Sequence, residues 1–304
     1  MKKNVLITGG SGFIGKHLTR LLIENGFSVS ILSRNFKQNS TDVSFYQWDL
    51  AKNFIEEDAV LKADYIIHLA GEGIAEKRWT SKRKQDIVQS RAQSVALVCS
   101  VLKKNNKQLE AFVTASGIGI YGAINGELIC SENTPAENDF LGSTCQLWER
   151  AADEVASLGI RTVKIRTGLV LGKNDGFLKK LTPIFKLKLG SALGSGKQYM
   201  PWIHVDDLCG IYLESINNAE MNGAYNAVIN DNTDNEGFSN ALCKIYGYSL
   251  WLPNVPAFLL KIALGEMAQI LLTGRRVSSD KIEKLGFQFR FKNLQNALRD
   301  CIEK

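Results

Sequence analysis

Glycines near the amino terminus have the spacing that phosphate binding requires. Gly9, Gly12 and Gly15 follow a short apolar run and precede residues whose apolar side chains recur with a helical period. Residues without a Cβ let the backbone approach a pyrophosphate, and the free N–H groups at a helix start point toward it. Between a predicted strand and a predicted helix, this pattern predicts dinucleotide binding, and the alternative is a glycine-rich turn without a ligand. The residues expected to contact the cofactor here are Gly9, Gly10, Ser11, Gly12, Phe13, Ile14 and Gly15.

The end of the second predicted strand indicates which dinucleotide is bound. This strand covers residues 28–32 and is followed by Ser33 and Arg34. A site for NAD usually has an acid here that binds the ribose 2′-hydroxyl, whereas an arginine can pair with the 2′-phosphate of NADP. Because no acid is present, we predict that Ser33 and Arg34 bind NADP, with NAD the less favoured cofactor. The alternative is that Arg34 is an ordinary exposed loop charge.

Small residues after the next strands are suited to close passage of a cofactor. We predict a third strand over 43–48, a short helix over 53–62, a fourth strand over 64–69 and a long helix over 81–104. The third strand leads into a loop expected beside the adenine, and the fourth is followed by small residues. The residues expected at the cofactor are therefore Asp49, Leu50, Leu69, Ala70, Gly71 and Glu72.

Strands and helices continue to alternate further along the chain. A fifth strand over 109–115 ends in Ser116, a helix covers about 142–158, and a sixth strand covers 161–166. This alternation predicts an α/β fold, a Rossmann-like doubly wound parallel sheet.

Beyond residue 172 the pattern becomes less regular. We predict a cofactor-binding domain over 1–172, with contributions from about 202–230, and a smaller, mostly helical C-terminal substrate lobe over 173–304. Asp206 and Asp207 are expected to be the N-cap and a first-turn acid of a helix rather than a catalytic pair. Residues 286–291 are expected to form a short strand or a packed turn.

Composition excludes several classes of function. The chain has 304 residues, of which 45% are hydrophobic and 22% charged, and a net charge of +6. The lysines are dispersed rather than gathered in one patch, so no nucleic-acid partner is expected. Six cysteines without a CxxC pair are expected to be reduced core thiols, and three histidines lack metal-ligand spacing, so no metal site is predicted. No apolar stretch reaches membrane-spanning length, and we expect a cytoplasmic protein without a membrane partner.

Five motifs together resemble the extended short-chain dehydrogenase/reductases, the superfamily of sugar-nucleotide epimerases and dehydratases. They are TGGSGFIG at 8–15, the Asp49-Leu50 pair, HLAG at 68–71, SGIGIYG at 116–122 and WIHVDDL at 202–208. A narrower resemblance, carried by RWTSKRKQDIVQSR at 78–91 and RTGLVLG at 166–172, is to an atypical subgroup labelled "epimerase family protein". This resemblance implies NADP binding and leaves the substrate undefined.

The catalytic pair of that superfamily is missing from this chain. Its members use Tyr-x3-Lys in the helix after the fifth strand, where the tyrosine is the acid or base and the lysine lowers its pKa and holds the nicotinamide ribose. Aligned on Glu149, the corresponding positions are Leu141 and Cys145. Leucine cannot transfer a proton and cysteine cannot supply a fixed positive charge, so the usual mechanism is absent.

Other residues are candidates for catalysis. Ser116 resembles the superfamily's catalytic serine, which hydrogen-bonds a substrate oxygen, or it is simply a small residue beside the cofactor. Tyr121 could reach the pocket, or it is a packed aromatic. Glu72 could carry a proton or bind the ribose. Cys145 is a conceivable thiol acid, and a buried inert thiol is the alternative.

The resemblance also places residues in the rest of the cleft. Arg91 lies where the superfamily's long helix approaches the nicotinamide half, and it could anchor an anionic substrate. The remaining residues expected at the cofactor are Arg91, Ser116, Arg166, Thr167 and Leu169, and those expected in the pocket wall are Trp148, Met200 and Trp202.

Two functions from different classes remain open at this point. The first is an NADP(H)-dependent oxidoreductase or epimerase-like enzyme on an unknown small molecule, in which the nicotinamide does the hydride chemistry. The second is a non-catalytic NADP-binding sensor or partner-binding protein. The helices at 81–104 and 142–158 correspond to those through which relatives dimerise, and both a monomer and a homodimer are compatible with the sequence.

Overall fold

An eight-stranded sheet forms the centre of the molecule. The computed structural model describes residues 2–35, 42–173 and 175–303. The strand order is β11-β8-β6-β5-β1-β2-β3-β4, and every neighbouring pair is parallel except β3 and β4. The predicted Rossmann-like doubly wound parallel sheet is therefore confirmed. The strands are β1 (Asn4–Thr8), β2 (Ser28–Ser33), β3 (Val43–Asp49), β4 (Phe54–Ile55), β5 (Tyr65–His68), β6 (Ala111–Gly117), β8 (Thr162–Thr167) and β11 (Gly223–Ala227).

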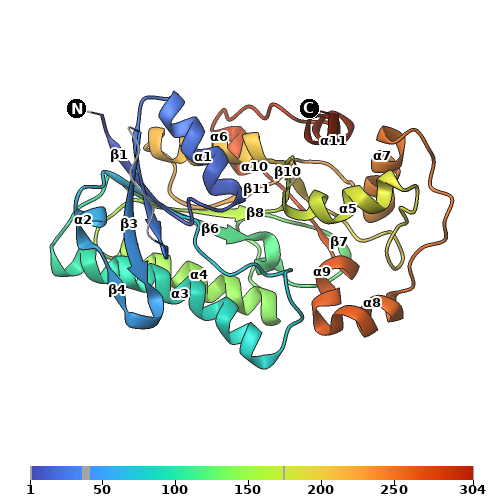
Figure 1. Ribbon diagram of the computed structural model, residues 1–304, viewed down its shortest axis with the longest axis horizontal. Helices are drawn as coiled ribbons and strands as arrows, with labels where there is room; N and C mark the ends of the chain where they lie inside the picture. Colours follow the sequence, from blue (N-terminus) through green and yellow to red (C-terminus); the bar gives the residue numbers. More distant parts are fainter. Residues whose placement is uncertain (1, 36–41, 174, 304) are drawn as a thin grey trace.

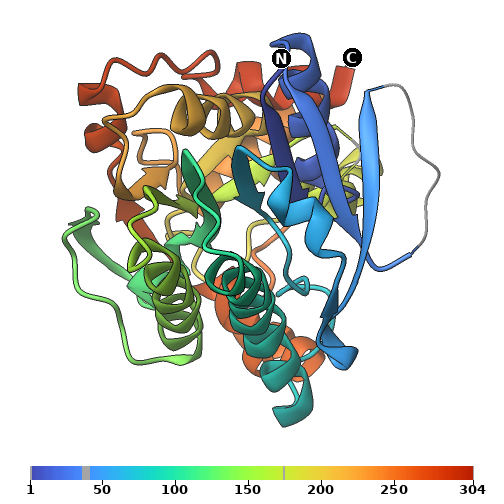
Figure 2. The same ribbon diagram turned by 90° about the vertical axis from the view of Figure 1, so that its left-hand side faces the viewer.

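Helices cover both faces of this sheet (Figures 1 and 2). Successive strand side chains point to opposite faces, so Val5 and Ile7 pack into one apolar cluster and Leu6 into the other. The first cluster includes residues of α1 and α6, and the second includes residues of α2, α3 and α4. These helices are α1 (Phe13–Glu24), α2 (Glu57–Leu61), α3 (Ser81–Lys104), α4 (Phe140–Ala156) and α6 (Val205–Asn217).

The C-terminal part is mostly helical, as predicted, and its helices α5, α7, α8 and α9 lie toward one end of the molecule (Figure 1). Its core is continuous with the sheet, because Phe289 and Leu298 belong to the same apolar cluster as Val5. The division of domains at residue 172 therefore stays a prediction. The remaining helices are α5 (Gly176–Lys186), α7 (Asn235–Ile245), α8 (Ala257–Leu264), α9 (Gln269–Leu272), α10 (Asp280–Lys284) and α11 (Leu294–Glu303).

Two small parallel pairs of strands and three 3-10 turns complete the described fold. β9 (Leu169–Leu171) pairs with β10 (Trp202–His204), and β7 (Gly126–Cys130) pairs with β12 (Arg275–Val277). The 3-10 turns are η1 (Leu50–Lys52), η2 (Ile118–Tyr121) and η3 (Gly265–Ala268).

The predicted long helix over 81–104 is confirmed, and the short helix predicted over 53–62 is present but begins later than expected. Residues 54–55 form β4, which pairs antiparallel with the end of β3, and helix α2 begins only at Glu57. Pairing Ile55 with Trp48 buries both apolar side chains against the sheet. Tertiary packing thus overrides the local helical preference of this short segment.

The start of α6 also differs from the prediction. The N-cap is His204, whose Nδ1 accepts a hydrogen bond from the Asp206 N–H at 3.2 Å, and both aspartates lie in the first helical turn. The Asp207 carboxylate accepts hydrogen bonds from the backbone N–H groups of Arg290 and Phe291 at 2.7 and 3.0 Å. Residues 286–291 accordingly form a packed irregular segment and not a strand.

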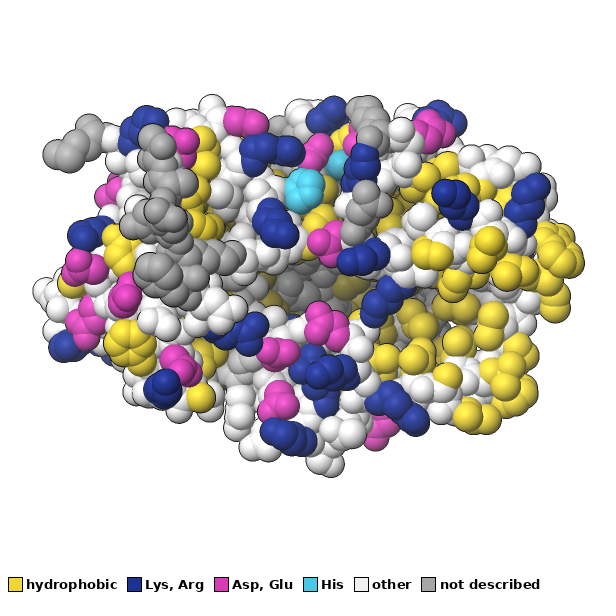
Figure 3. Space-filling model, in the orientation of Figure 1, with side chains coloured by type: hydrophobic (Ala, Val, Ile, Leu, Met, Phe, Trp, Pro, Cys, Tyr) yellow, Lys and Arg dark blue, Asp and Glu magenta, His cyan; other side chains and the backbone are white. Residues whose placement is uncertain are grey.

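Apolar side chains gather at the surface over one end of the molecule, where Figure 1 labels α5, α7 and α8 (Figure 3). Phe258 and Ile262 of α8 are 61% and 69% exposed, and no residue of α8 is buried. Among the described residues, no helix is long and apolar enough to cross a membrane. All six cysteines are free and buried.

A buried histidine at the end of β5 makes stability depend on pH. His68 is fully buried, and its Nε2 lies 2.9 Å from the Ser94 hydroxyl, which itself donates to the Ser90 carbonyl at 2.6 Å. Burial lowers the pKa of His68 from 6.5 to about 3. Because the unfolded chain then binds the proton more readily, the contribution of His68 is complete above pH 6.5 and is lost as the pH falls toward 3.

We therefore predict that wild-type protein loses more stability than a His68→Asn variant between pH 7.5 and pH 5. The expected difference is about 2 kcal/mol, since one pKa unit corresponds to about 1.4 kcal/mol. Urea unfolding at several pH values measures it, and comparing the changes with pH cancels any pH-independent loss of packing in the variant. Parallel pH profiles for the two proteins would show that His68 is not held neutral by the fold.

Candidate functional site

The turn between β1 and α1 is packed too closely for side chains. Gly9 has a φ of +73°, and a Cβ there would lie 3.0 Å from the backbone of Leu69 and Ala70. A Cβ on Gly15 would lie only 2.5 Å from the Gly10 Cα, because α1 passes directly against the turn. The Gly12 N–H donates to the Gly9 carbonyl at 3.0 Å and closes the turn.

The first turn of α1 is open to an anion. Its N-cap is Gly12, no side chain caps this helix start, and its first turn contains no acid. The first N–H groups of a helix have no partner within the helix, so here they are directed toward the region beyond the carboxyl end of β1. The chain runs from β1 to β2 and β3 on one side and continues with β5 on the other. Such a switch point is where open α/β sheets bind nucleotides, so the backbone at this turn fits a pyrophosphate.

Arg34 and Glu72 face each other across the ends of β2 and β5. The Arg34 side chain is 77% exposed, and its Nη1 lies 3.5 Å from a Glu72 oxygen. Glu72 is held more closely by Arg83, whose Nη1 donates to it at 3.0 Å. This hydrogen bond lowers the pKa of Glu72, so Glu72 is ionised at neutral pH and has no proton to donate. Ser33 is buried, and its hydroxyl accepts a hydrogen bond from the Asn35 N–H.

The other residues predicted beside the cofactor lie at the same ends of the strands. The Asp49 carboxylate caps η1 by accepting hydrogen bonds from the N–H groups of Ala51 and Lys52 at 3.0 and 3.3 Å, and Leu50 begins that turn. The Ala70 N–H donates to the Thr8 hydroxyl at 3.2 Å, which ties the residues after β5 to β1.

A buried carboxylate fixes the hydroxyl of Ser116. The Ser116 hydroxyl donates to Glu149 Oε1 at 2.7 Å, and both residues are buried. Arg166 donates to the two oxygens of Glu149 at 2.8 and 2.9 Å and so forms a buried bidentate ion pair with it. The hydrogen of Ser116 is therefore already used, and its oxygen is left able to accept a hydrogen bond.

The same network contains the hydroxyl of Tyr121. This hydroxyl donates to Asn226 Oδ1 at 2.7 Å and accepts from Arg166 Nη1 at 3.1 Å. Burial raises the pKa of Tyr121 to about 12. Its side chain is packed in the core with its proton already donated, which matches the packed-aromatic alternative. Arg166 likewise lies in this network, with its guanidinium on Glu149 and Tyr121.

Leu141 and Cys145, the positions that align with the superfamily's catalytic pair, both belong to apolar clusters. Leu141 packs beside the cluster of Trp79 and Met267, and Cys145 is buried with Tyr121. Burial raises the pKa of Cys145 to about 12, so its thiol stays protonated and weakly reactive.

The predicted pocket-wall residues are buried or partly buried. Trp202 is fully buried, and its indole N–H donates to Asp231 at 2.8 Å. Met200 is partly buried and packs against the apolar cluster that contains Trp202 and Val5. Trp148 is buried beneath Arg91. Thr167 ends β8, and the Leu169 N–H that begins β9 donates to the Pro201 carbonyl at 2.8 Å.

Sequence reasoning missed Glu149, Asn226 and Arg83 as members of the site. The available signal for Glu149 was an acid between Trp148 and Ala152, on the apolar face of a helix, where a charge needs a partner. Asn226 lies 105 residues from Tyr121, and no local pattern connects them.

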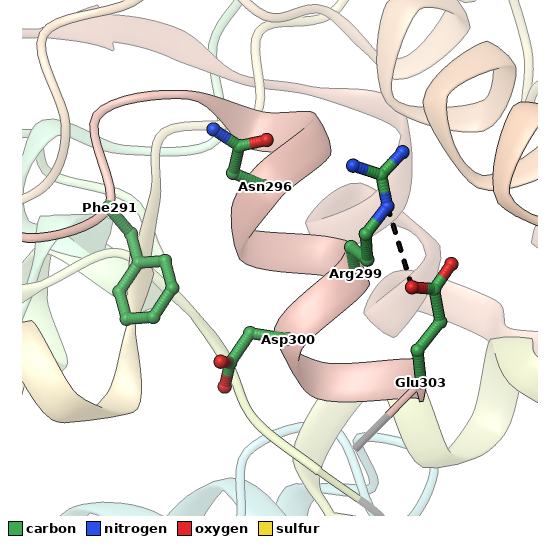
Figure 4. A pocket seen from close by; sticks show the side chains of 5 residues that line it. All are labelled: Phe291, Asn296, Arg299, Asp300 and Glu303. Carbon is green, nitrogen blue, oxygen red and sulfur yellow. Dashed lines mark ion pairs between the residues drawn. The ribbon is translucent and has the colours of Figure 1, made fainter.

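A surface hollow beside α11 contains none of the predicted site residues. It is lined by Phe291, Asn296, Arg299, Asp300 and Glu303, with an ion pair of 3.5 Å between Arg299 and Glu303 (Figure 4). Within the described residues, no group of three histidine, cysteine or acidic side chains could hold a metal ion.

Comparisons with known proteins agree with this geometry. A model of the NAD dependent epimerase/dehydratase family matches residues 5–228, and a domain of unknown function (DUF1731) matches residues 255–301. The epimerase family protein YfhF of Bacillus subtilis is 33% identical over 300 residues, 98% of this chain and 98% of that protein.

Two further relatives belong to plants and animals. The Arabidopsis thaliana protein named epimerase family protein SDR39U1 homolog, chloroplastic, is 34% identical over 312 residues, 98% of this chain and 86% of that protein. A crystal structure of human epimerase family protein SDR39U1 (isoform 2) with NADPH has a TM-score of 0.88 and 29% identity, with 99% of both chains covered.

We predict that Gly15→Ala lowers the free energy of unfolding by about 1–3 kcal/mol, because the added methyl group must displace backbone rather than a flexible side chain. Gly126→Ala is the matched control, since a Cβ at Gly126 meets nothing within 4 Å. Urea unfolding of both variants measures the difference. Equal stability of the two would contradict the close approach of α1 to the turn.

Proposed function

The chain belongs to the NAD dependent epimerase/dehydratase family, and we propose that it is an NADP(H)-dependent oxidoreductase acting on a small molecule. The observation that carries the choice of cofactor is Arg34, an exposed guanidinium at the end of β2 where an NAD site has an acid. The human relative crystallised with NADPH supports the same choice.

Three parts of this chain would hold the cofactor. The N–H groups at the start of α1 would bind the pyrophosphate, and Arg34 would pair with the 2′-phosphate. The ion pair between Arg34 and Glu72 is long and largely exposed, so it contributes little and does not hold Arg34 away from a phosphate. Gly9 and Gly15 keep side chains out of the turn.

Bound NADP(H) supplies hydride transfer, and the protein supplies orientation and the handling of protons. Ser116 is the polar side chain best placed for the substrate, because it lies next to the last residue of β6 at the carboxyl edge of the sheet. Since its hydrogen is donated to Glu149, its oxygen would accept a hydrogen bond from a substrate hydroxyl. Arg166 keeps the Glu149 carboxylate in place for that role.

A second function, NADP binding without turnover, is favoured by the state of the side chains that could have transferred a proton. Leu141 and Cys145 occupy the positions of the usual pair, the Tyr121 hydroxyl is used by Asn226, and Glu72 is ionised beside Arg83. A protein of this kind would use NADP to stabilise a surface for a partner.

The cofactor assignment predicts that Arg34→Ser weakens NADPH binding by about 10- to 100-fold and leaves NADH binding unchanged. A hydrogen bond to a charged group contributes about 1.5–3 kcal/mol, which corresponds to that range. Fluorescence titration with both coenzymes measures it. Arg20→Ser is the control, because Arg20 is an exposed arginine on α1 whose ion pair with Glu24 spans 3.9 Å. An unchanged NADPH affinity in Arg34→Ser would remove the 2′-phosphate assignment.

Turnover separates the two functions. Protein loaded with NADPH is offered aldehydes, ketones and quinones, and protein loaded with NADP⁺ is offered alcohols. We expect oxidation or reduction of the cofactor with at least one class, and we expect Ser116→Ala to lower kcat by about tenfold or more at unchanged NADPH affinity. Gly12→Trp, which blocks the start of α1, is the control without cofactor. Binding of NADPH without turnover on any class would support the non-catalytic function instead.

A further inference from the structure

Arg91 has an unusual environment for a half-buried arginine. It lies in α3, and its guanidinium carbon is 4.9 Å from the ring centre of Trp148 on α4. Its Nη1 donates to the Ile87 carbonyl of its own helix at 3.0 Å. In the described part of the chain, no other protein group accepts a hydrogen bond from it, although a guanidinium carries five N–H donors.

The charge of Arg91 also lacks a counter-ion. No carboxylate of the described residues lies within 4.0 Å of it, whereas Arg83 pairs with Glu72, Arg166 with Glu149 and Arg275 with Glu137. Burial lowers the pKa of Arg91, and the charge of Glu72, which raises it, acts without forming an ion pair with Arg91. A buried charge of this kind is costly unless it acquires a partner.

The position of Arg91 indicates where that partner would come from. A Cβ on Gly71, after β5, would lie 3.2 Å from the Arg91 guanidinium carbon, so Arg91 borders the residues that follow β5. The charge of Arg91 also acts on the thiol of Cys145, whose sulfur lies beside Gly117 at the end of β6. Arg91 therefore stands at the edge of the sheet that also carries Ser116, where ligands of open α/β folds bind.

We propose that Arg91 binds an oxyanion, a phosphate or carboxylate group of a ligand held in this cleft. The proposal rests on the proposed function for the identity of the ligand, which is either the cofactor through its pyrophosphate or the substrate through an acidic group. The guanidinium lies against the Trp148 ring, and its free N–H groups can engage two oxygens of one anion. Gly71 leaves the space that this arrangement needs.

The test compares Arg91→Met with wild type in two arms. In the first arm, titration with NADPH measures the affinity of each protein for the cofactor. In the second arm, inorganic phosphate or acetate is added to protein with and without NADPH, and the rise of Tm is measured. Loss of about tenfold or more in NADPH affinity assigns the cofactor as the source of the anion. Unchanged NADPH affinity with loss of the Tm rise assigns the substrate.

Two variants complete the experiment. Arg150→Met, an exposed arginine on α4, should behave as wild type in both arms. Arg91→Lys keeps the charge and loses the planar fork, and we expect an intermediate loss of affinity, so it tests the proposal even where Arg91→Met does not fold. Arg91 variants that match wild type in both arms would overturn the proposal. Failure of wild type to bind either coenzyme would overturn the proposed function alone, because the anion arm without NADPH still reports on Arg91.

Discussion

The close approach of α1 to the turn after β1 is the constraint on which this structure depends. Gly15 meets the Gly10 backbone, and Gly9 meets the backbone that follows β5, so three segments converge without intervening side chains. The same contact brings the uncapped start of α1 to the switch point of the sheet. Packing and ligand binding therefore require the same residues here, and neither can change without the other.

A second centre of the molecule is polar and buried. Glu149 receives hydrogen bonds from Ser116 and Arg166, and Arg166 continues to Tyr121. This network uses the hydrogen-bonding capacity of side chains that the sequence suggests as catalysts. The Glu149 carboxylate, held by Arg166, orients the Ser116 hydroxyl.

Local patterns predicted what depends on neighbours in the sequence. The turn over Gly9 to Gly15, the long helix over 81–104 and the parallel sheet follow from spacing and apolar periodicity, and the role given to Arg34 stays a prediction from its place after a strand. Contacts between distant segments were not predictable in this way. The first residues of the helix expected over 53–62 instead form a strand in which Ile55 pairs with Trp48. The hydrogen bond between Tyr121 and Asn226 joins residues that no periodicity relates. The ion pair of Arg166 with Glu149 required knowledge of how α4 packs on β8.

The C-terminal tail completes the interior of the site rather than standing beside it. The Asn226 side chain donates to the Ser278 carbonyl at 2.8 Å, and β12 pairs with β7. Asn226 and Ser278 belong to the two segments that match different family models, so those segments are not interchangeable modules. Because the acceptor in the tail is a backbone carbonyl, a chimera with a relative's tail would keep this hydrogen bond only if that tail placed its backbone beside Asn226.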